Sequence, residues 1–159
     1  MTALNAAEKN ILSVVDKHGW MVMSVAPRTH SDDPEEWWSY TIGLTKTFQW
    51  PELICFGLGG KVAHPVLNDA VAELQRRNLR PLPGVVLADV LDGFDAKLIT
   101  PFPMSSDYLG SAIWFSRHFD LPAPPPVVQL VWPDKDGIFP DDPLCAEGVK
   151  REQTPLEPE

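Results

Sequence analysis

The sequence feature that most constrains this fold is an unbroken apolar run, Leu53 to Phe56, followed by two glycines and a long amphipathic segment. An apolar run without alternation is typical of a strand buried on both faces, so we expect residues 52–58 to form a central strand. Residues 61–78 then carry apolar side chains at the spacing of one helix face: Val62, Val66, Leu67, Ala70, Val71 and Leu74. The sequence therefore predicts a central strand and a helix that packs against its sheet.

Five other segments have the length and the β-branched or aromatic content of strands. They are residues 20–26, 37–44, 85–90, 96–100 and 127–132. Two more helices are predicted, at residues 6–17 and from Ser106 or Asp107 to Phe119. Residues 27–36 are expected to form a polar loop. This order predicts an α+β fold with two layers, a mostly antiparallel sheet of five or six strands and two or three packed helices.

The length of 159 residues fits one domain, which we place at residues 1–143. Residues 144–159 are polar and acidic and contain proline, so we expect them to bury almost no apolar surface against the core. We therefore predict that this tail is disordered and dispensable for folding.

The charge balance restricts the partners that the chain can have. A formal net charge of −9 repels a phosphate backbone, and the one basic cluster, at Arg76, Arg77 and Arg80, fits the end of a helix. We therefore expect no nucleic-acid partner. No apolar run approaches the roughly 20 residues of a membrane helix, and the first residues lack the pattern of a signal peptide. These features predict a cytoplasmic protein without a membrane partner.

Several polar side chains interrupt otherwise apolar strands and helices. They are Tyr40, Thr41, Glu52, Asn68 and Gln129, with Trp132 and Asp134 following the last strand. Burying an unpaired polar group costs roughly 1–3 kcal/mol, so each of them needs a partner. One interpretation is a structural network. The other is that they converge at one end of the sheet on a ligand, with Tyr40, Asn68, Gln129 and Trp132 lining one pocket.

Motifs for metal binding and nucleophilic catalysis are absent from the sequence. The four histidines are isolated, and the Asp134 to Gly137 segment lacks the spacing of a calcium loop. Cys55 lies in an apolar strand, where a thiol stays inert. We therefore predict no metal site, and the sequence identifies no cofactor.

Seven short motifs in a fixed order are similar to those of one protein family. They are His18-Gly19-Trp20, Tyr40 to Leu44, Pro51-Glu52-Leu53, Leu67-Asn68, Asp107 to Gly110, Gln129 to Asp134 and Gly137 to Pro140. Together they make residues 10–143 resemble the bacterial domain of unknown function (DUF) family 4262. The resemblance implies no mechanism and no cofactor.

Three classes of function remain open at this point. The first is binding of a small, nucleotide-like or aromatic ligand, which the aromatic content and the polar set favour. The second is protein interaction, as a homodimeric adaptor or as a partner in a conflict system. The third is a hydrolase or transferase that uses Glu52 or Asp134 as its acid or base.

Overall fold

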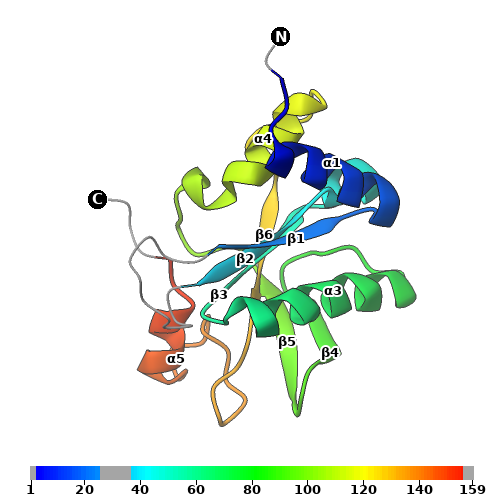
Figure 1. The fold of residues 1–159 in the computed structure, drawn as a ribbon. Helices are drawn as coiled ribbons and strands as arrows, with labels where there is room; N and C mark the ends of the chain where they lie inside the picture. The colour runs from blue at the N-terminus through cyan, green and yellow to red at the C-terminus, as the bar shows by residue number, and fades with distance from the viewer. Residues whose placement is uncertain (1–2, 26–36, 156–159) are drawn as a thin grey trace.

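The fold is described from a computed structural model, which describes residues 3–25 and 37–155 (Figure 1). The predicted loop at 27–36 lies outside these residues. Six strands form one sheet: β1 (Met21–Val25), β2 (Trp38–Ile42), β3 (Glu52–Phe56), β4 (Val86–Leu91), β5 (Phe94–Ile99) and β6 (Val127–Val131). Their order across the sheet is β1-β2-β3-β6-β5-β4. All six predicted strands are confirmed.

The pairing of the strands is mixed. β3 and β6 run parallel at the centre, and the other four neighbouring pairs are antiparallel. Every residue of β3 is buried, which confirms the central position that its apolar run predicts. The α+β class with a mostly antiparallel sheet is therefore confirmed.

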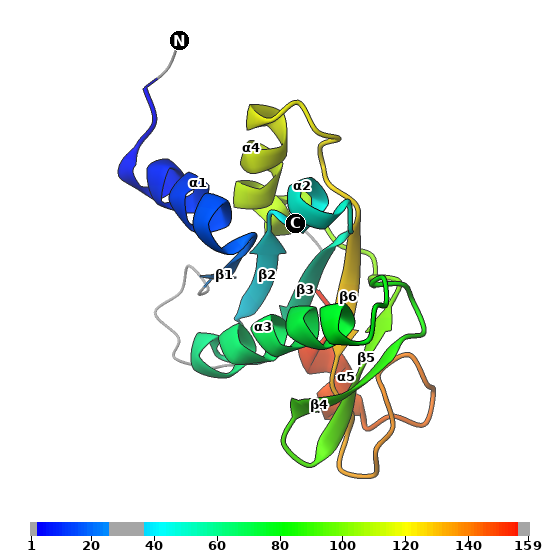
Figure 2. The same cartoon turned by 90° about the vertical axis from the view of Figure 1, so that its right-hand side faces the viewer.

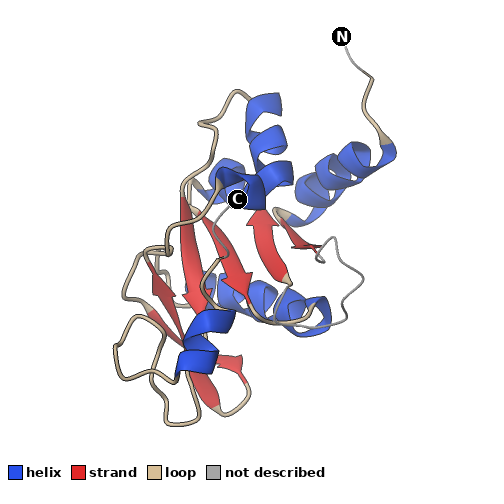
Figure 3. Ribbon diagram, turned by 90° about the vertical axis from the view of Figure 1, so that its left-hand side faces the viewer, coloured by secondary structure: helices blue, strands red, loops and turns tan. Residues whose placement is uncertain are grey.

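Helices cover both faces of the sheet. They are α1 (Ala6–His18), α2 (Leu44–Phe48), α3 (Gly60–Arg76), the short 3-10 helix η2 (Ser106–Leu109), α4 (Gly110–His118) and α5 (Glu147–Glu152). Helix α3 lies nearest the viewer in Figure 2 and α5 lies in front of the sheet in the opposite view of Figure 3. The described chain thus has five α-helices where two or three were predicted, and a third layer where two layers were predicted.

The alternation of β3 divides the core into two parts. Leu53 and Cys55 pack with the apolar stripe of α3. Ile54 and Phe56 point to the other face, where they pack with α1 and α4. Each fully buried Leu or Ile contributes about 1.5–3 kcal/mol of transfer free energy, so both cores stabilise the same central strand.

The predicted disorder of the tail is wrong for its described part. Residues 147–152 form α5, and the side chains of Cys145, Gln153 and Pro155 are buried. The prediction failed because the segment has no apolar stripe of its own. It is held instead by hydrogen bonds to distant backbone, which local composition cannot reveal.

Candidate functional site

Glu52, at the start of β3, is buried and accepts hydrogen bonds from the end of β2 and from the start of α2. Its carboxylate accepts from the Thr41 hydroxyl at 2.9 Å and from the backbone N–H of Leu44 at 3.1 Å. The N–H of Gly43 and both donors of Thr45 complete the set at 3.1–3.2 Å. Glu52 therefore satisfies the free amides at the start of α2, as a capping side chain does.

Burial raises the pKa of Glu52 above its usual value, while the hydrogen bonds from Thr41, Thr45 and Leu44 act in the opposite direction. Thr41 is fully buried and also accepts a hydrogen bond from the N–H of Leu53. Both side chains thus tie β2, β3 and α2 together. The partner that Glu52 needs is thus supplied by two threonine hydroxyls and three backbone N–H groups.

Tyr40 and Gln129 lie on the same face of the sheet, on either side of Ile54. Two strand spacings separate them, which is about 10 Å. The Tyr40 hydroxyl accepts a hydrogen bond from the N–H of Ser111 at 3.1 Å, and burial raises its pKa. The Gln129 carboxamide accepts from Phe102 N–H and donates to the carbonyl of Gln153.

Asn68 and Trp132 belong to the opposite face, the one that α3 covers. Asn68 accepts a hydrogen bond from the Trp20 indole at 2.9 Å. Trp132 packs against the α3 core, and its indole N–H donates to the carbonyl of Phe56 at 3.1 Å. The structure therefore does not bring Tyr40, Asn68, Gln129 and Trp132 into one pocket.

Asp134 follows β6 and joins three backbone segments. Its Oδ1 accepts from the N–H groups of Asp136 and Ile138, and its Oδ2 accepts from the N–H of Ala146 at 2.9 Å. These backbone donors, Ile138 first, hold the pKa of Asp134 below its usual value. A carboxylate with this many donors is a structural anchor in its ionised form.

The predicted polar set is therefore used in internal hydrogen bonds. No buried side-chain nitrogen or oxygen within the described part of the chain lacks a hydrogen-bond partner. The structural-network interpretation of the set agrees with this geometry. A role of these residues in ligand binding stays a prediction.

The open surface lies elsewhere, between the β4–β5 hairpin and the loop that follows β6. Two depressions of about 410 and 390 Å³ adjoin there, because Gly137 and Phe139 line both. The first also contacts the hairpin, and the second reaches Lys97 and Pro143. We call this surface the hairpin groove; its lining includes Asp89, Phe94, Asp95, Lys97, Phe139, Asp141 and Asp142.

The hairpin groove combines aromatic side chains with carboxylates. Phe94 is 48% exposed, and Leu144, next to the lining residue Pro143, is 78% exposed. Lys97 is the one cation that lines the groove, and its ammonium group binds Asp141 at 2.7 Å and lies over the Phe139 ring. The lining thus combines apolar groups with four carboxylates, those of Asp89, Asp95, Asp141 and Asp142, and a single lysine.

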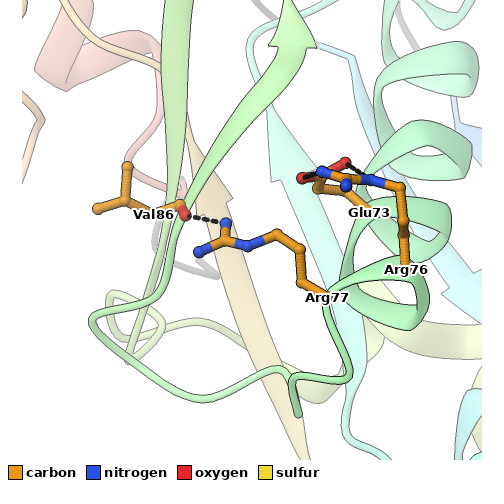
Figure 4. A network of polar contacts seen from close by, with 4 residues as sticks. All are labelled: Glu73, Arg76, Arg77 and Val86. Atoms are coloured by element: carbon orange, nitrogen blue, oxygen red, sulfur yellow. Dashed lines mark hydrogen bonds and ion pairs between the residues drawn. The ribbon is translucent and has the colours of Figure 1, made fainter.

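The outer edge of β4 borders this region, and two features of this edge oppose pairing with a strand of another molecule. The Arg77 guanidinium, just after α3, donates to the carbonyl of Val86 at 3.0 Å (Figure 4). Asp89 has a φ of +65° at a register shift between β4 and β5. A bulge and a charged side chain both oppose the addition of another strand, so the groove rather than the strand edge is open to a partner.

Sequence reasoning missed the groove and Gln153. The Asp92-Gly93 turn signal locates the hairpin, but no local pattern indicates that residues 133–143 fold beside it. Gln153 stands in a polar segment, so its complete burial has no signal in the sequence around it. Both depend on contacts between segments that are far apart in the sequence.

Within residues 3–25 and 37–155, no three His, Cys, Asp or Glu side chains are grouped so as to hold a metal ion. No helix in that part of the chain has the length and apolar content to cross a bilayer.

Comparison with known proteins gives a family and no function. Neither the curated proteins nor the solved structures include a significant match to the chain. One family model matches residues 14–146, which is most of the chain and includes every strand. On that match, the chain belongs to the family described as Domain of unknown function (DUF4262).

Proposed function

We propose that this chain is a protein-interaction module whose hairpin groove binds a basic segment of another protein. The observation that carries the proposal is the presence of exposed Phe94 and the exposed carboxylates of Asp89, Asp95 and Asp142 in one groove. Exposed aromatic groups supply contact area in protein interfaces. Carboxylates in the lining attract lysine and arginine and orient their approach.

The other two classes of function have less support. A small-ligand site is usually an enclosed pocket with a few free polar groups, whereas the polar set here is engaged in internal hydrogen bonds. The enzyme hypothesis rests on Glu52 and Asp134, and the oxygens of both accept hydrogen bonds from backbone amides. Their burial and these hydrogen bonds support a structural role for both carboxylates.

Site-specific photo-crosslinking in the producing cells tests the proposal. Phe94 is replaced by the photoreactive p-benzoylphenylalanine, and Val62, which is 51% exposed on α3, is replaced in a control. We expect an adduct from position 94 that is absent from position 62, with a crosslinked segment rich in Lys or Arg. The same adducts from both positions, or an acidic or neutral segment, would contradict the proposal.

Neutral variants of two carboxylates in the groove lining separate the contribution of charge attraction to binding from that of apolar contact. Asp89→Asn with Asp95→Asn keeps side-chain size and removes two charges from the groove. Asp16→Asn with Asp69→Asn makes the same change in net charge on the exposed surfaces of α1 and α3. We expect the first pair, and not the second, to weaken the adduct and reduce its sensitivity to salt.

A further inference from the structure

The loop that forms one wall of the hairpin groove is fixed by the same carboxylate that fixes the start of α5. Oδ1 of Asp134 accepts from the N–H of Ile138, whose side chain lines the groove, at 3.0 Å. Oδ2 of the same carboxylate accepts from the N–H of Ala146, the residue that precedes α5, at 2.9 Å. Loop and helix therefore share one anchor that is 4% exposed.

The far end of α5 is fixed to the strand that leads into the same loop. The Gln153 carboxamide accepts from the N–H of Trp132 and donates to its carbonyl, and the Gln153 carbonyl accepts from Gln129. Since Trp132 is two residues before Asp134, both ends of α5 are attached to one short stretch of chain. We call residues 146–155 the C-terminal strap.

The strap buries little apolar surface. No residue within α5 is buried, and its burial is concentrated in Gln153 and Pro155. A segment with few buried apolar contacts opens at low cost. The family match also ends at residue 146, where the strap begins. The strap thus follows the matched segment and is held to it by Asp134, Gln129 and Trp132.

We propose that docking of the C-terminal strap regulates the hairpin groove by holding residues 134–143 in the shape that binds a partner. The effect on partner affinity rests on the proposed function. The coupling between the strap and residues 134–143 is a property of the free protein. Release of the strap frees the Ala146 N–H from Asp134 and loosens the groove wall, which lowers affinity. By linkage, a partner in the groove stabilises the docked strap to the same extent.

Hydrogen exchange of the full chain without a partner tests the coupling. We expect Gln153→Ala, which removes both hydrogen bonds between its carboxamide and Trp132, to speed exchange about tenfold or more in the strap and in residues 134–143. Exchange in α3 should stay unchanged. Gln49→Ala, which removes an exposed glutamine whose carboxamide contacts only Lys46 in its own turn, is the matched control and should alter neither segment.

A second variant covers the case in which Gln153→Ala does not fold. Ala146→Pro removes only the N–H that Asp134 accepts, and the φ of −55° at Ala146 suits proline. We expect the same linked rise in exchange. A rise confined to the strap, or an equal rise throughout α3, would overturn the coupling.

The two proposals fail separately. One outcome is that the position-94 adduct forms while hydrogen exchange in residues 134–143 is the same in the strap variants as in the parent. In that case the coupling is wrong and the proposed function of the groove stands. If exchange is linked, the Gln153→Ala variant should lower the yield of the position-94 adduct about fivefold or more. An unchanged yield beside linked exchange would also overturn regulation by the strap.

Discussion

The Gln153 carboxamide closes a ring of two hydrogen bonds with the backbone of Trp132, 2.9 Å at the N–H and 2.8 Å at the carbonyl. A side chain thereby pairs with the residue just past β6 as a neighbouring strand would. The relation explains how a polar segment is ordered without an apolar face. It also makes Gln153 and the helix before it part of the fold.

Removal of residues 147–159 should therefore destabilise the protein. Loss of Gln153 leaves the Trp132 amide and Gln129 without their partners, at a cost of about 1–3 kcal/mol. For a domain of this size, that lowers Tm by roughly 3–10 °C. Differential scanning calorimetry checks it, and an unchanged Tm would restore the interpretation of a dispensable tail.

Glu52 should be the most sensitive of the predicted polar residues. Glu52→Ala leaves buried N–H groups of Gly43 and Leu44 unpaired and should cost about 3 kcal/mol or more. Glu52→Gln keeps the shape but turns an amide group toward donors, so we expect a cost of about 1–2 kcal/mol. Urea unfolding measures both, and two variants that unfold like the parent would show that the carboxylate stabilises nothing.

Asp134 predicts a pH-dependent contribution to stability. Its folded pKa lies below the unfolded value of 3.8, so the folded state favours the ionised form. The stabilisation is present above about pH 3.8 and is lost as pH falls through the folded pKa. The difference in Tm between the parent and Asp134→Asn should therefore be constant near neutral pH and shrink in acid. A difference that grows as pH falls would contradict this assignment.

Arg77 and Arg76 offer a matched pair at the end of α3. Arg77→Met frees the Val86 carbonyl at the sheet edge, which should cost about 1 kcal/mol and increase self-association (Figure 4). Arg76, with a side chain 67% exposed, pairs with Glu73 one turn earlier and not with the strand edge, so Arg76→Met should leave self-association unchanged. Sedimentation velocity and thermal unfolding compare the two. Equal behaviour of both variants would mean that Arg77 does not protect the edge.

Much of the fold was predictable because local patterns carry it. The unbroken apolar run of β3 predicts its burial on both faces, and the apolar stripe of α3 predicts which face of the helix is buried. Both patterns consist of residues that are close together in the chain. The short helix α2 was missed because its first amides are satisfied by Glu52, a residue beyond its end. The burial of Glu52 was predicted from its position before an apolar run, but its full set of donors was not.

The sequence by itself determined the strands, the main helices and the family, since periodicity and short motifs are local properties. Only the tertiary structure decided which polar groups meet. Gln129 and Gln153 are 24 residues apart, and Phe56 and Trp132 are 76 apart. Such contacts depend on how the sheet brings distant segments together, and no pattern within one segment encodes them. The separation of Asn68 from Tyr40 and the closure of the strap over β6 therefore followed from topology and packing.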